Sequence, residues 1–444
     1  MRRVMVWSFC FLLLAKWAPA RDLEEILKEK GVITSSEATE SKTAGKEPQG
    51  KADSSLPDWA KKLTLFGDVR LRNESFLRSG DPDRVRQRFR LRAGAKAAVN
   101  DATEIGFKLA SGNPNDPISN NQTFTDTFTF KSINITNAYL KLLPAEPLGF
   151  SKPYLTLMGG KFDTPTYTPT RLLLDGDLTP EGFFESLKPL DEKSGFVRSV
   201  QLNFGQWVYQ EVTKRTDGAL FPFQGVMTLA PTGGVTTNLG IADYVFHKPD
   251  LIATSRNTNT SLAITNRVVL SDGTVVGGKL VDPSKAGPNK DGKDAAGKPI
   301  TITGFVSRFN VLNLGGDTTI DTGMSHWPLK VFGDYAKNTE AKGGDDTGFQ
   351  VGAGLGAAKD PGELSFSYAY QRLETDAVVS AFTDSDFGHD GGTNTKGHIL
   401  QVNYVLLKGL LFTSTAWIDE PIQNVSGRNS KTDYRWQVDL LAKF

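Results

Sequence analysis

Residues 84–92 read Arg84-Val85-Arg86-Gln87-Arg88-Phe89-Arg90-Leu91-Arg92, with an arginine at every second position. Side chains two residues apart share one face of a β-strand, whereas a helix would spread these arginines around its circumference. The preceding segment repeats the pattern, with Arg70 and Arg72 set against Val69 and Leu71. A soluble sandwich could offer one such face to water, but a closed barrel with a wet lumen and a lipid-facing exterior needs this alternation on every strand. The pattern therefore favours a transmembrane β-barrel.

The first 20 residues have the features of an export signal. Arg2 and Arg3 precede an apolar stretch from Val4 to Ala15, which is well short of the roughly 20 residues that a spanning helix needs. Ala18-Pro19-Ala20 matches an A-x-A cleavage site, so we expect a signal peptide over residues 1–20. The single cysteine, Cys10, lies inside it, so the mature protein would have neither disulfides nor thiol chemistry.

The C-terminal segment alternates up to the last residue, Phe444. Such a strand, ending in an aromatic residue, resembles the assembly signal of bacterial outer-membrane barrels. Together with the export signal, it predicts a multi-pass barrel in the outer membrane of a Gram-negative bacterium, with Phe444 recognised by the barrel-assembly machinery and the barrel surrounded by lipid and lipopolysaccharide. The apolar parity of the segment consists of Tyr434, Trp436, Val438, Leu440, Ala442 and Phe444.

The overall composition excludes a global electrostatic field. The full chain has a formal charge of +1, with 51 Lys and Arg against 50 Asp and Glu. Removing the signal peptide takes away Arg2, Arg3 and Lys16, which leaves a balance of −2. Hydrophobic residues make up 39% of the chain, and after the signal no apolar run is long enough for a spanning helix. Any preference for ions must therefore come from local arrangement.

Three regions follow the signal peptide. Residues 21–40 have apolar residues at helical spacing and a natural helix stop at Gly31, so we expect a short helical segment that could contact the cell wall. Residues 41–62 are polar and contain Gly and Pro, which indicates a flexible linker. Residues 63–444 repeat alternating runs of about ten residues separated by turns or loops, as outer-membrane barrels do.

These runs predict an all-β fold, an antiparallel barrel of about 16 strands, since closed single-chain barrels prefer even numbers. Long connections are expected at 112–133, 163–197, 271–301 and 375–395. The candidate strands are residues 63–76, 85–99, 103–111, 134–143, 153–162, 198–209, 220–230, 237–247, 260–270, 302–313, 328–338, 347–357, 363–374, 396–407, 410–419 and 432–444.

The parity of the first three strands places a set of basic side chains on the inner face. An arginine at the lipid midplane costs about 2–4 kcal/mol, so the inward orientation is nearly forced. Two interpretations remain open: a wall that attracts anions, or arginines that pair with lumen carboxylates and hold the barrel in shape. The candidate pore-lining residues are Arg70, Arg72, Arg84, Arg86, Arg88, Arg90, Arg92, Lys96 and Lys108.

The connection over 163–197 is the candidate constriction loop. It supplies the acidic residues Asp175, Asp177, Glu181 and Glu185, and Thr179-Pro180-Glu181 has the order of an N-cap and first helical turn. Folded inward against the arginines, these carboxylates would create a transverse field that selects solutes by charge and size.

Other functional classes have weaker support. The four histidines, His247, His326, His389 and His398, are widely spaced and no hydrolase motif accompanies them, although a Ser-His pair assembled across strands stays open. Two loop clusters could hold Ca²⁺, but neither has EF-hand spacing, and solvated loops are favoured. An adhesin or a tether to the cell wall is a further alternative. The clusters are Asp384, Asp386 and Asp390, and Asn289, Asp291 and Asp294.

Residues 64–187 resemble the bacterial putative porin family, whose members are single-chain outer-membrane barrels. Residues 27–34 look like the helix that precedes the barrel in that family. The resemblance implies passive diffusion of small hydrophilic solutes and ions, a homotrimer, no catalysis and no cofactor. Where family members often carry a tryptophan before the Asp-x-Asp pair, this chain has Leu172-Leu173-Leu174. The matching pieces are residues 66–74 (FGDVRLRNE), 88–96 (RFRLRAGAK), 105–112 (IGFKLASG), 138–140 (AYL), 160–162 (GKF) and 175–182 (DGDLTPEG).

Overall fold

The computed structural model describes residues 62–78, 82–144, 154–192, 194–259, 261–286, 288, 291–389, 391–425 and 432–444. The chain divides into two parts, residues 1–61 and residues 62–444, and the account below concerns the second. The predicted signal peptide, the helical segment at 21–40 and the linker at 41–62, apart from Lys62, lie outside the described residues. Within them, no helix is both long enough and apolar enough to cross a bilayer.

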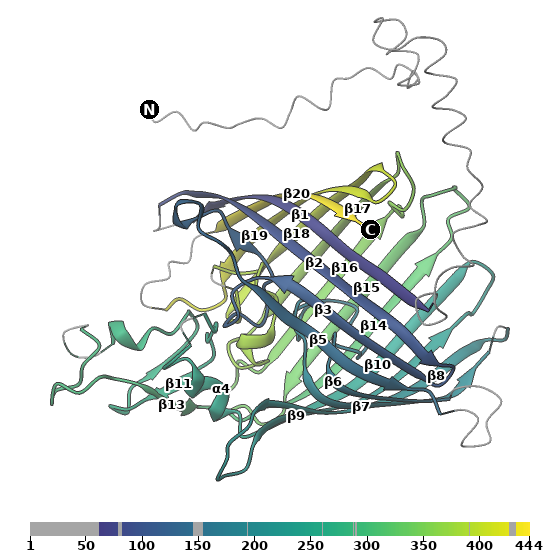
Figure 1. Ribbon diagram of the computed structural model, residues 1–444. Helices are drawn as coiled ribbons and strands as arrows, with labels where there is room; N and C mark the ends of the chain where they lie inside the picture. Colours follow the sequence, from purple (N-terminus) through teal and green to yellow (C-terminus); the bar gives the residue numbers. More distant parts are fainter. Residues whose placement is uncertain are drawn as a thin grey trace, which may run out of the picture. The chain divides into compact units, whose positions relative to one another are not determined.

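Sixteen antiparallel strands of the described chain form a closed barrel (Figure 1). Each strand pairs with the next, and the last strand pairs with the first from Asp68 opposite Lys443 to Leu77 opposite Tyr434. The barrel strands are β1 (Leu63–Leu77), β2 (Arg84–Asn100), β3 (Thr103–Ser111), β5 (Ile133–Leu142), β6 (Leu155–Lys161), β7 (Glu181–Asp191), β8 (Val197–Gln210), β9 (Gly218–Leu229), β10 (Val235–His247), β14 (Asn310–Ile320), β15 (Leu329–Asn338), β16 (Thr347–Leu355), β17 (Leu364–Leu373), β18 (Thr395–Leu407), β19 (Leu410–Pro421) and β20 (Asp433–Lys443).

The strands alternate between an apolar outer face and a polar inner face. On β1, Val69 and Leu71 are exposed on the outer face, whereas Asp68, Arg72 and Glu74 are buried on the inner face. A barrel in lipid has to satisfy all backbone groups between strands and keep charges off the outer face, which is why both closure and alternation are present. The predicted all-β barrel of about 16 strands is confirmed.

The long connections leave the barrel at the end opposite the short turns. The four longest join β3 to β5, β6 to β7, β10 to β14 and β17 to β18, and by the usual pattern of outer-membrane barrels this end is extracellular. The β3–β5 connection contains β4 (Gln122–Thr123), which pairs with β2, and a 3-10 turn η3 (Asp126–Phe128).

The β10–β14 connection forms a small structure of its own. It contains α4 (Asp250–Ser255), a 3-10 turn η5 (Pro283–Lys285) and a three-stranded sheet of β11 (Val268–Leu270), β12 (Val275–Val276) and β13 (Ile302–Phe305). Ile252 and Leu262 belong to an apolar cluster that this connection shares with the β6–β7 and β17–β18 loops. The Asp250 carboxylate accepts a hydrogen bond from the Phe305 backbone N–H at 2.8 Å, which joins the helix to the sheet.

Two predicted strands and one predicted loop differ from the structure. Residues 260–270 do not cross the membrane, because their apolar side chains are buried in the core of the β10–β14 connection and only Val268–Leu270 is a strand. The predicted strand 302–313 is divided between β13 of that connection and β14 of the barrel. The predicted loop 163–197 contains the barrel strand β7, so the β6–β7 loop ends at residue 180.

Candidate functional site

The arginines of β1 and β2 are opposite one another in the sheet. The register places Arg70 opposite Arg90 and Arg72 opposite Arg88. Like charges directly across an antiparallel pair are destabilising, so this part of the wall needs carboxylates between the arginines.

Carboxylates on β1 and the neighbouring strand β20 supply part of that compensation. Asp68 accepts hydrogen bonds from Arg90 at 2.9 Å and from Arg92 at 2.7 Å. Asp439 of β20 binds Arg72 through two parallel bonds, both at 2.7 Å, the fork geometry in which guanidinium and carboxylate fit best.

Glu74 is the most enclosed of these carboxylates, with a side chain that is 0% exposed. It pairs with Arg86 and Arg435, accepts a hydrogen bond from Gln437 at 2.7 Å, and lies 3.8 Å from Arg88 Nη1. One carboxylate thus holds arginines of β2 and β20 together across β1.

Two loop carboxylates complete the network from the lumen side. Asp177 of the β6–β7 loop lies 3.5 Å from Arg92 and 3.8 Å from Arg90. Asp386 of the β17–β18 loop lies 2.6 Å from Arg435 and 3.4 Å from Arg72. Both loops are therefore folded into the barrel and docked on the arginines.

The β6–β7 loop contacts several sides of the lumen in turn. Asp163 pairs with Lys108 of β3. The Tyr167 hydroxyl then donates to Asp317 of β14 at 2.5 Å, and the Thr170 hydroxyl donates to Asp334 of β15 at 2.7 Å. Because Asp177 returns to β2, the loop runs from one wall to the opposite wall and back.

The β17–β18 loop packs on the β6–β7 loop. The Thr383 hydroxyl donates to the Leu172 carbonyl at 2.8 Å, and the Ser385 backbone N–H donates to the Asp175 carboxylate at 3.1 Å. Leu172, at the Leu172-Leu173-Leu174 departure from the family pattern, is fully buried here. The two loops, including the 3-10 turn η6 (Ser380–Phe382), form one body inside the barrel.

Sequence reasoning missed the β17–β18 loop, which it treated as an external connection. The signal was present in the apolar run Ala377-Val378-Val379, whose side chains are almost completely buried. Such a run is out of place in a solvated loop. The candidate calcium ligand Asp386 instead pairs with arginines, and Asp291 and Asp294 accept hydrogen bonds from their own loop backbone. Asp390 and Asn289 lie outside the described residues.

Acidification from pH 7 to about pH 5 is expected to leave both loops docked. Burial alone would raise the pKa of Asp177 and Asp386, but the adjacent arginines outweigh it and hold both pKa values below the usual range. A carboxyl with a lowered folded pKa adds stability above its unfolded pKa of about 3.9, and this is lost as the pH falls through the folded pKa. Burial, with like charge nearby, raises the pKa of Asp175 and Asp384. The free-energy cost of holding these two carboxylates charged in the folded protein therefore decreases as the pH falls.

Limited proteolysis of the folded barrel in detergent at pH 7, 6 and 5 measures this. Equal or greater resistance of the two loops at pH 5 is expected. New cleavage in residues 162–180 or 374–394 at pH 5 would contradict the assignment of Asp177 and Asp386 as the residues that hold these loops on the arginines.

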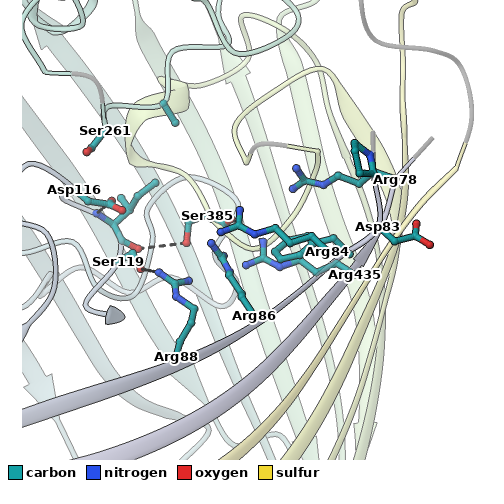
Figure 2. Close-up of a pocket in the computed structure, with 14 residues that line it drawn as sticks. Arg78, Asp83, Arg84, Arg86, Arg88, Asp116, Ser119, Ser261, Ser385 and Arg435 are labelled. Carbon is teal, nitrogen blue, oxygen red and sulfur yellow. Dashed lines mark hydrogen bonds between the residues drawn. The ribbon is translucent and has the colours of Figure 1, made fainter. Parts of the chain in front are cut away.

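An open cavity of about 630 Å³ lies above this network, toward the long-loop end (Figure 2). Ser119 of the β3–β5 loop lies beside Arg88, which donates to its Oγ at 3.4 Å, and Ser385 of the β17–β18 loop lies beside Arg435, which donates to its backbone carbonyl at 3.0 Å. Five arginines and two acidic residues line it: Arg78, Arg84, Arg86, Arg88, Arg435, Asp83 and Asp116. We call this cavity the vestibule.

The predicted basic residues differ in how far they are neutralised. Arg72, Arg86, Arg90, Arg92 and Lys108 each form a salt bridge of 3.5 Å or less to a carboxylate. These five residues fit the interpretation in which basic side chains pair with lumen carboxylates and hold the barrel in shape.

The remaining four basic residues have weaker partners. Arg70 donates to the Asn121 side chain at 2.6 Å and lies 3.8 Å from Asp439. Among the described residues, Arg88 donates at 3.4 Å to Ser119 Oγ and to the Asn121 carbonyl, and it lies 3.8 Å from Glu74. Arg84 and Lys96 are exposed, and in the part of the chain that the structure describes neither has a salt bridge.

Comparison with known proteins identifies the family. A family model described as "Putative porin" matches residues 76–444. The chain belongs to this porin family. Together with the closed sixteen-strand barrel, this membership establishes a multi-pass β-barrel of the outer membrane. No curated protein sequence matches the chain.

Solved porin structures share the architecture at low identity. OprB of Pseudomonas putida at high pH is 12% identical, with a TM-score of 0.53 over 87% of this chain and 95% of its own. OmpF of Salmonella typhi with daunomycin is 9% identical, with a TM-score of 0.48 over 86% of this chain and 97% of its own. An anion-selective porin from Comamonas acidovorans is 13% identical, with a TM-score of 0.47 over 86% of this chain and 99% of its own. The likeness to OprB shows the fold alone.

Two of the four acidic residues predicted for the constriction of this porin, Glu181 and Glu185, have the parity of the outer face of β7. Glu185 is opposite Leu157 and Phe204, and its neighbours of the same parity, Phe183 and Leu187, are 61% and 43% exposed. Glu185 therefore faces outward. Glu181 has the same parity and pairs with Lys161 at 2.8 Å. The predicted helical turn at Thr179-Pro180-Glu181 is absent among these described residues, since Glu181 begins β7.

This difference gives a paired prediction for the porin. Asp177→Asn removes a carboxylate that faces Arg90 and Arg92, so the selectivity for anions over cations is expected to rise. Glu185→Gln changes the outer face only, so selectivity is expected to stay at the wild-type value. Reversal potentials in planar bilayers under a KCl gradient measure both, and a shift for Glu185→Gln equal to that for Asp177→Asn would contradict the assigned faces.

The predicted assembly signal, Phe444, lies at the closing seam of the porin. Its backbone exchanges two hydrogen bonds of 3.1 Å with Gly67 of β1. A Cβ at residue 67 would lie 2.4 Å from the Phe444 ring and 2.5 Å from the Arg92 carbonyl, so glycine permits this close approach. Recognition of Phe444 by assembly machinery stays a prediction.

Proposed function

We propose that the protein is a passive diffusion channel for small hydrophilic solutes and ions, with a preference for anions and no catalytic activity. Membership of the porin family and the closed barrel support the channel. The observation that carries the anion preference is the vestibule, where Arg84 and Arg88 lack a close carboxylate among the described residues. Focused positive potential at a pore mouth raises the local concentration of anions.

The constriction in this proposal is the two-loop body rather than the β6–β7 loop alone. Its attachment to β2, β14 and β15 would narrow the lumen, and Asp177 lies on the side facing the arginines. Solutes would pass beside this body, between fixed charges of opposite sign. A homotrimer, contact with lipopolysaccharide and contact of residues 21–40 with the cell wall are proposals that follow from the family resemblance.

Planar bilayer recordings of the refolded full chain test the proposal. Under a KCl gradient, we expect discrete current steps and a reversal potential on the anion-selective side. The double variant Arg84→Gln, Arg88→Gln is expected to lose most of that selectivity, because it removes both weakly compensated charges of the vestibule.

Arg372→Gln is the matched control. Arg372 shares its parity on β17 with the exposed residues Phe366 and Tyr368 and pairs with Glu374 at 3.1 Å, so it faces outward. Its removal is expected to leave the reversal potential unchanged. A folded barrel without current steps would refute the channel, and a cation-selective wild type would refute the anion preference.

A further inference from the structure

The guanidinium groups of the vestibule are crowded around one ring. Phe76 has the Cζ atoms of Arg78, Arg86 and Arg435 at 4.6, 4.9 and 5.1 Å from its centroid. The ring face attracts each cation but does nothing to separate their charges. Like charges that converge on a cavity repel one another, and an anion that enters the cavity offsets this repulsion.

Fixed carboxylates pair with two members of this cluster. Glu74 and Asp386 lie beneath the vestibule and bind Arg86 and Arg435. Arg88 has a buried Nε atom with no hydrogen-bond partner among the described residues, and its closest carboxylate oxygen is 3.8 Å away. Arg84 is exposed at the start of β2 without a described salt bridge.

Serine side chains also line the vestibule. Ser119, Ser261 and Ser385 line it together with the apolar side chains of Ile118 and Ala263. Asp116 also lines the cavity, and burial raises the pKa of its carboxyl group. A volume of about 630 Å³ is within the range of sites that hold small organic molecules.

We propose that the vestibule is a binding site for small solutes that carry two or more oxyanion charges, such as organic phosphates or di- and tricarboxylates. Arg84 and Arg88 would each present a guanidinium fork to one oxyanion, and the serine hydroxyls would bind the remaining polar atoms. A monovalent anion would engage only one fork and bind more weakly. The assignment rests on the proposed channel function for its physiological role, and it names the class of solute that the channel concentrates.

Calorimetric titration of the refolded full chain in detergent tests the site, with sodium pyrophosphate, sodium citrate and sodium acetate at matched ionic strength. Saturable binding of pyrophosphate, citrate or both is expected, with acetate binding much more weakly. A higher affinity for pyrophosphate would indicate phosphates as the solutes, and a higher affinity for citrate would indicate carboxylates. Each of Arg84→Gln and Arg88→Gln is expected to weaken binding about tenfold or more, since each removes a guanidinium that would form charge-assisted hydrogen bonds to the solute.

Two control variants accompany the titration. Arg372→Gln on the outer face should bind as the wild type does. Arg84→Lys keeps the charge but loses the fork, so it should recover part of the affinity lost in Arg84→Gln. Absence of saturable binding, or equal affinity in the wild type and both glutamine variants, would overturn the proposal.

Bilayer recordings separate this proposal from the channel function. Current steps that pyrophosphate and citrate do not reduce, in a protein that fails to bind them, would refute the site and leave the channel intact. Binding by a folded barrel that conducts no current would refute the channel and leave the site intact.

Discussion

Replacing Glu74 by glutamine is expected to lower the free energy of unfolding by about 3–5 kcal/mol, the cost of breaking a buried ion pair. Glutamine keeps the shape but removes the charge that neutralises Arg86 and Arg435, and both guanidinium groups would remain in the protein. The same change should make the channel more anion-selective. Urea unfolding of the refolded barrel, followed by tryptophan fluorescence, measures the stability, and the reversal potential measures the selectivity.

Asp83→Asn is the control for this experiment. Asp83 is an exposed residue at the rim of the vestibule, with no salt bridge among the described residues. Its replacement is expected to change stability by less than about 0.5 kcal/mol, as surface substitutions usually do. If Glu74→Gln were no more destabilising than Asp83→Asn, the ion pairs beneath the vestibule would not hold the wall together.

Replacing Asp386 by asparagine is expected to release the β17–β18 loop from the wall. Asp386 connects the loop to Arg435 at 2.6 Å and to Arg72 at 3.4 Å, and breaking such a buried contact costs about 3–5 kcal/mol. A released loop would leave more of the lumen open, so single-channel conductance should rise and fluctuate more. Cleavage by a protease added to the folded barrel should become faster within residues 374–394.

Asp346→Asn is the matched control, since Asp346 lies in the β15–β16 loop at the same end of the barrel. Its partner Lys337 is 3.3 Å away and half exposed, and such surface pairs contribute about 0–1 kcal/mol. Conductance and protease resistance should therefore stay at wild-type values. Equal conductance for Asp386→Asn and the wild type would show that the loop does not depend on this anchor.

The parts of the fold that were predictable from sequence are those with local periodicity. The arginines of β2 and the alternating pattern of β3 gave strands whose ends lie within one residue of those observed. β7 was missed because Glu181 and Glu185 occupy outer-face positions where an alternating pattern calls for apolar residues. The Ala377–Val379 run was missed because an apolar segment in a loop has no periodicity to indicate what it packs against.

The candidate site was only partly predictable, because its contacts are non-local. Parity placed Arg72 on the inner face, but no local pattern could pair it with Asp439, 367 residues away in the chain. The same applies to Asp386, which the sequence favoured as a solvated loop residue and which is in fact a docking contact of that loop. Which arginines remain unpaired, and hence where a solute could bind, depends on these distant partners.

The seam between the first and last strands has a consequence for the order of assembly. The pairs Arg435–Glu74 and Arg72–Asp439 both cross it, joining residues more than 360 positions apart. Before the final strand has paired, Arg72 lacks Asp439, and Glu74 and Arg435 lack each other. Charges without partners are costly within a membrane. Barrel closure and formation of these ion pairs are therefore the same step of assembly. A truncated or stalled chain would have unpaired charges in the membrane, which disfavours its insertion as an open, leaky pore.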